Sequence, residues 1–269
     1  MTERFMSENM PILALRGLVV FPEQTVHFDI GRMKSVLALE AAMKKDQILM
    51  LVPQKDIMHD DPLPKQLHTI GTVVRVKQIL KGQGENIRVL VNGLHRAKVT
   101  HFAQLEPFLS GSVEPVEDTL WDENLRTVAL RREANSLYSA YVDYIDKPSQ
   151  AVQLRLMSTM DCGILADTIA QNTSMDYQDK IKLLSQLNPV RRLEKAISLL
   201  HQELQVLQIE TDIQEKTRSY IDQEQRDYFL REQMKVIREE LGEGDDPSEI
   251  SEYQRKILEL GLPAESEKK

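Results

Sequence analysis

The chain has 269 residues, enough for one large or two ordinary domains, with a formal net charge of −8 and a pI near 5.4. Apolar residues make up 41% and charged residues 28%, which is typical of a globular protein with some long exposed helix. The acidic balance argues against a nucleic-acid-binding protein, and no apolar run is long enough to span a bilayer.

The N-terminal sequence MTERFMSENM has two acidic residues and no apolar core, so it is unlike a secretory signal or a transit peptide. The single cysteine, Cys162, has no partner for an internal disulfide. Together these features predict a cytoplasmic protein.

Residues 1–116 are predicted to be mostly strand, because short apolar or alternating runs recur between turn residues. The predicted strands are Pro11–Leu15, Thr25–Ile30, Ile48–Val52, Thr72–Leu80, Asn86–Gly93, 96–102 and 110–116. A glycine-rich segment, KGQGE, predicts a hairpin turn at 81–85. One helix, near Met33–Lys45, interrupts the strands. Several short strands and one helix favour a small closed or nearly closed β-domain.

The hydrophobic period becomes helical after residue 116, which gives the chain an α+β fold class. The predicted helices of a bundle over residues 117–187 are Leu120–Ile145, Gln150–Met160, Ile164–Gln171 and Tyr177–Leu187. Asp161 and Ser174 are the predicted N-caps of the last two helices.

A long helix is predicted over residues 188–244, with Asn188 as its cap and Pro189 in its first turn. Neither Gly nor Pro occurs from Val190 to Leu241, and an uninterrupted helix of that length would be roughly 75 Å long. Its first part carries an apolar seam that anchors it in the bundle: Leu193, Ile197, Leu200, Leu204 and Leu207.

The middle of this helix, Thr211–Asp227, has few apolar residues, which predicts that it projects from the bundle. An apolar stripe then returns with Tyr228, Leu230, Met234, Ile237 and Leu241. We expect this stripe to contact another subunit's helix or a further domain. The alternative is that the helix folds back on its own bundle. Residues 245–269 are predicted to be a linker with one amphipathic piece that contains Tyr253, Ile257 and Leu260.

No catalytic, cofactor-binding or metal-binding motif is present. The sequence contains no P-loop, no G-x-S-x-G and no H-E-x-x-H. Cys162 is interpreted as a packing residue at a helix start, and His59–Asp61 as an exposed loop rather than a metal site. A chain of this length without such chemistry is predicted to be a binding or assembly module.

Four segments resemble the Lon family of ATP-dependent proteases. QRDYFLREQMKVIREELGE (Gln225–Glu243) is similar to the family's long-helix signature, and PILALRGLVVFPEQTVHFDIGRMKSVLALEAAM (Pro11–Met43) to its amino-terminal opening. IRVLVNGLHRAKV and GILADTIA are similar to two further family segments in the expected order. The resemblance extends from about Met10 to Leu262, which is nearly the whole chain.

The resemblance implies a PUA-like β-barrel domain, a helical bundle and a long helix that leads to an AAA+ ATPase and a protease domain with a Ser–Lys dyad. This sequence has neither of the last two domains, so it is expected to be the amino-terminal region of a bacterial Lon protease, ending before the ATPase. No cofactor is expected in this chain, since ATP and Mg²⁺ would belong to the ATPase. The family also implies homo-oligomers, with a hexamer for the whole protein.

The resulting hypothesis is a substrate-recognition and assembly region that engages exposed apolar segments of unfolded or damaged proteins. The candidate substrate contacts are Phe21, Pro22 and Met33, and ordinary loop packing is the alternative for each. Two other functions are open. One is a PUA-like RNA-binding protein, against which the acidic pI counts, and the other is a free-standing coiled-coil adaptor.

Overall fold

The computed structural model describes residues 7–81, 87–145, 149–241, 252, 253, 255 and 256. The chain divides into two compact units, Met1–Leu207 and Gln208–Lys269. The turn predicted within KGQGE and nearly all of the predicted linker, with Ile257 and Leu260, lie outside the described residues.

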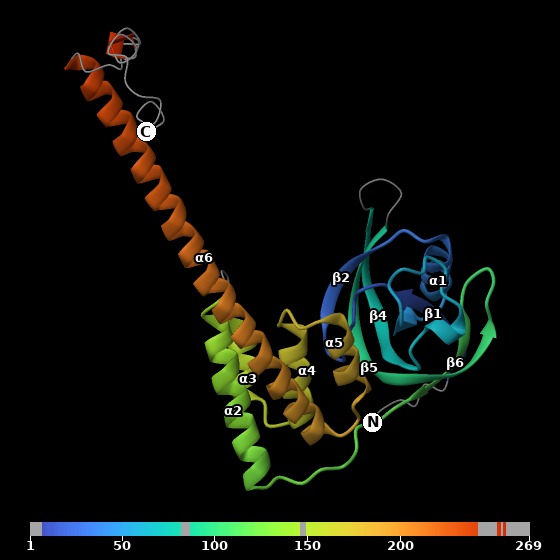
Figure 1. Cartoon of the computed structure of the whole chain (residues 1–269). Helices are drawn as coiled ribbons and strands as arrows, with labels where there is room; N and C mark the ends of the chain where they lie inside the picture. The colour runs from blue at the N-terminus through green and yellow to red at the C-terminus, as the bar shows by residue number, and fades with distance from the viewer. Residues whose placement is uncertain (1–6, 82–86, 146–148, 242–251, 254, 257–269) are drawn as a thin grey trace, which may run out of the picture. The chain divides into compact units, whose positions relative to one another are not determined.

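A mixed sheet forms the first part of the Met1–Leu207 unit (Figure 1). Its strands are β1 (Ser7–Leu15), β2 (Thr25–Ile30), β3 (Ile48–Pro53), β4 (Ile70–Lys81), β5 (Ile87–Gln104) and β6 (Ser110–Pro115). The strand order is β2-β5-β4-β3-β1-β6, and β5 pairs additionally with β6. The pairings therefore run in a circuit from β5 through β4, β3, β1 and β6 back to β5. Helix α1 (Met33–Met43) packs against β1 and β3, and a short 3₁₀ turn, η1 (Pro64–Gln66), precedes β4.

Strand β5 differs from the prediction, because one strand of 18 residues replaces two predicted strands. Gly93 was expected to end the first of these strands. Instead it exchanges backbone hydrogen bonds with the segment before β2: its N–H donates to the Gln24 carbonyl at 2.8 Å, and Glu23 donates to the Gly93 carbonyl at 2.9 Å. A Cβ atom at Gly93 would lie 2.1 Å from the Phe21 carbonyl oxygen. The glycine therefore permits a close backbone approach within a continuous strand.

The helices follow the predicted hydrophobic periods. They are α2 (Leu125–Val142), α3 (Gln150–Ser158), α4 (Cys162–Gln171), α5 (Tyr177–Ser185) and α6 (Pro189–Glu240). The continuity of α6 over 52 residues confirms the prediction of one unbroken helix. Figure 1 shows α4 and α5 between the sheet and the pair formed by α2 and the first part of α6.

Two of the three predicted N-caps are confirmed and one is wrong. Asp161 accepts a hydrogen bond from the Ile164 backbone at 2.8 Å, and Asn188 caps α6 through the Arg191 backbone at 3.0 Å. The expected cap at Ser174 is wrong, because Asp176 caps α5. A carboxylate immediately before the first helical residue accepts from the free N–H groups more directly than a hydroxyl two residues earlier.

The largest apolar core joins the bundle to the sheet. Most of its buried residues come from α2, α4, α5 and the first part of α6, but Val19 and Phe21, from the connection between β1 and β2, pack into the same cluster. Phe21 has an exposed fraction of 0%. A segment of the β-domain therefore supplies a core side chain to the helices.

Phe21→Ala is expected to lower the free energy of unfolding by about 3–5 kcal/mol, because it removes a fully buried aromatic ring and leaves a cavity. Trp121, the only tryptophan, packs against the same cluster, so its fluorescence during urea unfolding reports the loss. Phe229→Ala is the matched control, since Phe229 is 60% exposed on α6, and it should change stability by less than about 0.5 kcal/mol. Equal effects of the two variants would contradict the assignment of Phe21 to the core.

Candidate functional site

The three residues predicted as substrate contacts do not form one site. Phe21 was expected on an exposed loop, and this is wrong, because its ring is needed to fill the core between sheet and bundle. Pro22 is half-buried beside a cleft at that junction, whereas Met33 is 72% exposed beside a separate groove. Of the three, Met33 alone presents a large apolar side chain to solvent.

The groove beside Met33 is called the α1 groove here, and it has a volume of about 230 Å³. Its lining residues are Ile12, Ala14, Arg32, Met33, Lys34, Ser35, Asp60, Asp61, Pro62 and Leu109. Ile12 and Leu109 are buried core residues, so they provide an apolar floor. Charged side chains stand around this floor, which is the arrangement expected for a shallow binding surface.

Of the four charged residues that line the α1 groove, Lys34, Asp60 and Asp61 form ion pairs, whereas one nitrogen of Arg32 is buried without a hydrogen-bond partner. The Lys34 ammonium contacts Asp61 and Glu106, both at 2.7 Å, and Arg16 contacts Asp60 at 2.8 Å. The hydrogen bonds that Lys34 donates to Asp61 and Glu106 raise its pKa, so this lysine stays protonated at neutral pH. Because the carboxylates are already paired, the rim of the groove is polar without a large excess of one charge.

A buried glutamine fixes the loop that forms one wall of this groove. Gln54 accepts a hydrogen bond from Arg32 at 2.9 Å and donates to the His59 carbonyl at 3.0 Å. Its own backbone carbonyl accepts from the Tyr177 hydroxyl of α5 at 2.8 Å. Burial raises the pKa of Tyr177 to about 12, so the phenol remains a neutral donor at physiological pH. The 55–62 loop is thereby tied both to α1 and to the bundle.

Further exposed apolar side chains lie on the segments that supply the groove. These are Ile57, Met58, Leu63 and Leu105, and Met58 is 76% exposed. Ile57, Met58 and Leu63 belong to the stretch that also carries Asp60, Asp61 and Pro62, and Leu105 is adjacent in sequence to Glu106. Flexible thioethers suit a surface that must accept many different apolar partners.

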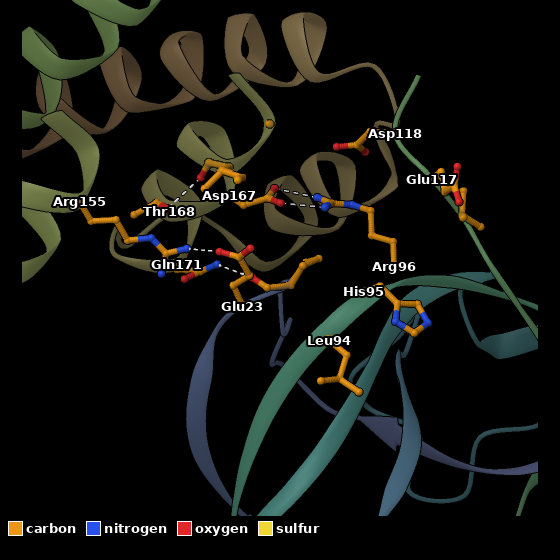
Figure 2. A pocket seen from close by; sticks show the side chains of 14 residues that line it. Glu23, Leu94, His95, Arg96, Glu117, Asp118, Arg155, Asp167, Thr168 and Gln171 are labelled. Atoms are coloured by element: carbon orange, nitrogen blue, oxygen red, sulfur yellow. Dashed lines mark hydrogen bonds and ion pairs between the residues drawn. The ribbon is translucent and has the colours of Figure 1, made fainter. Parts of the chain in front are cut away.

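A second concavity, of about 260 Å³, lies between the sheet and the bundle (Figure 2). Its lining includes Pro22, Glu23 and Arg96 from the β-domain and Arg155, Asp167 and Gln171 from the helices. Glu23 pairs with Arg155 at 2.5 Å, and Gln171 donates to the Pro22 carbonyl at 3.1 Å. These contacts hold the sheet against the bundle.

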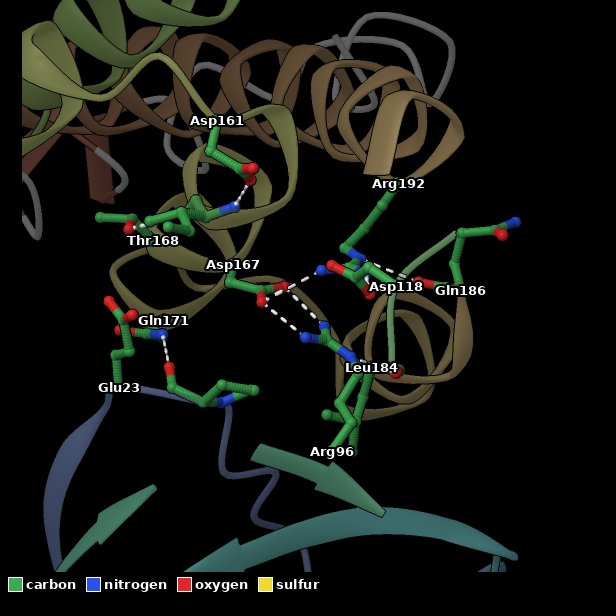
Figure 3. A network of polar contacts seen from close by, with 12 residues as sticks. Glu23, Arg96, Asp118, Asp161, Asp167, Thr168, Gln171, Leu184, Gln186 and Arg192 are labelled. Carbon is green, nitrogen blue, oxygen red and sulfur yellow. Dashed lines mark hydrogen bonds and ion pairs between the residues drawn. The ribbon is translucent and has the colours of Figure 1, made fainter. Parts of the chain in front are cut away.

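Deeper in this junction, two arginines share one aspartate (Figure 3). Arg96 of β5 donates to both carboxylate oxygens of Asp167 on α4, each at 2.7 Å. Arg192 of α6 donates to Asp167 at 3.2 Å and also pairs with Asp118. Arg96, Asp167 and Arg192 are all buried. The Nε groups are satisfied as well, because that of Arg96 donates to the Leu184 carbonyl at 2.9 Å and that of Arg192 to the Gln186 carbonyl at 2.8 Å.

Sequence reasoning missed this ionic cluster, although two of the quoted segments each contain one of its members. Arg96 lies in IRVLVNGLHRAKV, and Asp167 is the single charge in GILADTIA. A lone charge in an otherwise apolar segment is the signal that could have indicated a buried pair. Gly163 also belongs to this arrangement, since a Cβ there would come within 3.0 Å of Asp118 and 3.2 Å of Arg192.

The residues weighed in the sequence as a nucleophile or a metal site are engaged in packing or in ion pairs. Cys162 is buried, and burial raises the pKa of its thiol, which disfavours the nucleophilic thiolate. Asp60 and Asp61 are engaged in the ion pairs of the α1 groove. Within the described ranges no group of three or more His, Cys, Asp or Glu residues could hold a metal ion. No helix in the same part of the chain has the length and apolar composition needed to cross a membrane.

The stripe predicted for helix contacts is exposed along α6. Tyr228, Leu230, Met234, Ile237 and Leu241 each expose about half or more of their surface. The helix thus carries large apolar side chains that are not part of the cores of the Met1–Leu207 unit.

A model of a known protein family matches most of this chain. Residues 9–202 match the model of the ATP-dependent protease La (LON) substrate-binding domain. The chain belongs to the Lon family. The matched range includes the α1 groove and the ionic cluster, and most of the described structure before the exposed part of α6.

Curated Lon proteases are similar over nearly the whole of this chain. The identity is 38% with the protein of Xanthomonas oryzae pv. oryzae, 36% with that of Escherichia coli and 35% with that of Clostridium acetobutylicum, and 97–99% of this chain is covered. The chain spans about a third of the length of these relatives, between 31% and 34%.

Two solved structures share the fold of the Lon N-terminal domain. The N-terminal domain of Lon from the Mycobacterium avium complex has a TM-score of 0.59 at 20% identity, with 72% of this chain and 98% of that chain covered. The Lon N-terminal domain protein from Xanthomonas campestris has a TM-score of 0.51 at 17% identity, with 71% and 97% covered. At this identity the similarity concerns the fold.

Asp167→Asn is expected to lower the free energy of unfolding by about 3–5 kcal/mol, because it leaves Arg96 and Arg192 buried without their shared counter-charge. Urea unfolding followed by Trp121 fluorescence measures this loss. Asp29→Asn is the matched control, since Asp29 forms a similar two-pronged pair with Arg88, at 2.7 and 2.9 Å, but on the surface. That pair should contribute little to stability, because water and salt screen an exposed ion pair. A loss of similar size in both variants would contradict a special role for burial at Asp167.

Proposed function

We propose that this chain is the substrate-recognition region of a Lon protease and that its α1 groove binds exposed apolar segments of unfolded or damaged proteins. The observation that carries the proposal is the α1 groove itself, which has a buried apolar floor, ion-paired charges around it and the exposed Met33 in its lining, with Met58 exposed on the loop that supplies Asp60 and Asp61. Membership of the Lon substrate-binding domain family supports a protein as the ligand.

The chemistry of the groove suits weak binding of many sequences. The apolar floor contributes affinity without direction, because the hydrophobic effect depends on buried area. Lys34, Asp60 and Asp61 pair with residues of opposite charge, so these three neither require nor strongly repel a particular charge in the ligand, whereas Arg32 is hydrogen-bonded to the neutral Gln54. Exposed methionines can adapt to different apolar side chains at low cost in strain. Such a surface favours unfolded chains, since folded proteins bury the segments it would contact.

Other parts of the proposal concern the surroundings of this site. The circuit of strand pairings supports a description of the sheet as a PUA-like barrel. The exposed stripe on α6 supports contacts with other Lon subunits, within a hexamer of the whole protein. ATP and Mg²⁺ would bind to an ATPase domain of the whole protein, and no cofactor is proposed for this chain. The proposed location is the cytoplasm.

Met33→Ala combined with Met58→Ala is expected to weaken binding of an unfolded protein about five- to tenfold, because truncating two exposed side chains removes on the order of 1 kcal/mol of apolar burial on binding. Fluorescence anisotropy with a labelled, permanently unfolded protein measures the affinity, and the folded form of that protein should bind more weakly. The melting temperature should stay nearly constant, since both side chains are exposed.

Leu154→Ala combined with Met157→Ala is the matched control for this experiment. Both residues are exposed on α3, at 68% and 65%, and neither lines the α1 groove. This variant should bind the unfolded protein like the unchanged chain. If it loses as much affinity as the Met33 and Met58 variant, or if the latter loses none, the α1 groove is not the binding site.

A further inference from the structure

A third concavity lies where the segment between β1 and β2 meets helices α4 and α5. It has a volume of about 290 Å³ and is called the connector pocket here. Its lining residues are Gly17, Leu18, Val19, Gln24, Val26, Ala170, Gln171, Met175, Tyr177 and Lys180. None of them lines the α1 groove, so the two concavities are separate sites.

The walls of the connector pocket are mostly apolar. Leu18 and Val26 are half-buried on the side of the β-domain, and Ala170 and Met175 are buried on the side of the bundle. Tyr177 adds its ring to these walls, since its hydroxyl group is already engaged by a backbone carbonyl. Such walls favour an apolar group, because binding removes its surface from water.

Of the described residues that line this pocket, Lys180 on α5 is the only charged one. Its ammonium group donates to the Thr173 carbonyl at 2.8 Å, which uses one of its three hydrogens. No ion pair joins it to a carboxylate in the part of the chain that the structure describes. Burial lowers the pKa of Lys180, and the attraction of Glu203 offsets this only in part. A ligand carboxylate would stabilise this partly buried cation.

The buried arginines of the ionic cluster show the contrast. Arg96 and Arg192 each reach the carboxylate of Asp167, so their charges are compensated within the fold. Lys180 has a neutral carbonyl in place of a counter-charge, and this carbonyl fixes the ammonium just after the end of α4. The pocket therefore presents a positioned cation with two hydrogens left for a ligand.

We propose that the connector pocket binds the carboxyl-terminal residue of an unfolded polypeptide, with the side chain of that residue between the apolar walls and its terminal carboxylate on Lys180. The proposal rests on the part of the proposed function that makes an unfolded protein the ligand, and not on the α1 groove. It adds a site that recognises the end of a chain rather than an apolar segment within it.

The size of the connector pocket favours a single residue. Its volume of about 290 Å³ lies at the small end of ligand pockets, which start at about 300 Å³, and is roughly twice that of a cavity that holds benzene. One side chain of the size of leucine fits this space together with its carboxylate, whereas an extended segment does not. An internal apolar residue would bring no charge to Lys180, and an aspartate would bring a carboxylate with little apolar surface.

Two glutamine side chains suit the last peptide group of such a ligand. The amide oxygen of Gln24 accepts from the Phe21 backbone at 2.9 Å, and the amide nitrogen of Gln171 donates to the Pro22 carbonyl at 3.1 Å. These bonds leave the amide nitrogen of Gln24 as a donor and the amide oxygen of Gln171 as an acceptor. A terminal peptide group needs one of each, because it carries one carbonyl and one N–H.

A pair of peptides tests the charge recognition. One is a short fluorescent peptide that ends in leucine with a free carboxylate, and the other has the same sequence with a terminal amide. Fluorescence anisotropy with the whole chain should show about tenfold weaker binding of the amide, because it lacks the charged hydrogen bond to Lys180. Equal affinity of the two peptides for the unchanged chain overturns the proposal without any need for a variant.

Substitutions then assign this preference to one side chain. Lys180→Met should bind both peptides alike, at the affinity of the amide, whereas Lys180→Arg should keep most of the preference because it keeps the charge. Lys182→Met is the matched control: Lys182 is exposed on the same helix, pairs with Asp179 at 2.7 Å and does not line the pocket. This control should keep the tenfold preference. A preference that survives Lys180→Met, or that Lys182→Met removes equally, overturns the role of Lys180.

Two further ligands test the apolar walls and the source of the carboxylate. A peptide that ends in glycine should bind about fivefold more weakly than the leucine peptide, because it has no side chain to bury. Equal binding of these two peptides contradicts the apolar part of the site. Octanoate should compete poorly, since it lacks a peptide group for Gln24 and Gln171. If octanoate displaces the peptide with the same affinity, the pocket is a fatty-acid site and the assignment to chain ends is overturned.

The connector pocket and the α1 groove can fail separately. The quantity measured here is the ratio of the affinities for the carboxylate and amide peptides, which the combined Met33 and Met58 variant should leave unchanged. A ratio near one, in a chain whose binding of unfolded protein depends on Met33 and Met58, overturns the connector pocket and supports the α1 groove. A tenfold ratio that depends on Lys180, in a chain indifferent to the two methionines, supports the connector pocket and contradicts the α1 groove.

Discussion

The arrangement of the Met1–Leu207 unit depends on a carboxylate shared by two arginines. Asp167 receives Arg96 from the sheet and Arg192 from the start of α6, and all three are buried. Buried charges are costly unless every one is paired, so the strand and both helices must come together in this geometry for any of them to be stable. A cluster of this kind specifies an arrangement more than it adds net stability. It explains why the β-domain and the bundle share one apolar core.

This coupling also decides where a binding surface can lie. The segment between β1 and β2 looks like an exposed apolar loop in the sequence, but the junction uses Phe21 as core and Pro22 as part of the sheet–bundle contact. Apolar side chains far from the junction remain available, and Met33 at the start of α1 is among the most exposed of them. Charged partners around the α1 groove limit its apolar area, which keeps a surface of this kind from becoming an aggregation site.

The sequence predicts most of the elements because their signals are local. Alternation identifies Thr25–Ile30, and the absence of Gly and Pro identifies the length of α6. The errors arise where distant contacts decide. Gly93 resembles a strand end until the Phe21 backbone is found against it, and the Arg96–Asp167 pair joins residues 71 positions apart. Neither propensity nor periodicity contains that information, so burial of Phe21 and the ionic cluster required the tertiary structure.

Helix α6 has different requirements along its length. At its start, Arg192 is completely buried and the helix is fixed by pairing with Asp167 and Asp118. From residue 208 to Leu241 every side chain is exposed, including several large apolar ones. The polar stretch Thr211–Asp227 lacks the apolar area to hold the helix on a core, whereas the apolar stripe from Tyr228 to Leu241 would be poorly tolerated in water. A partner helix resolves both conditions, because it can cover a narrow apolar seam while the other faces remain hydrated.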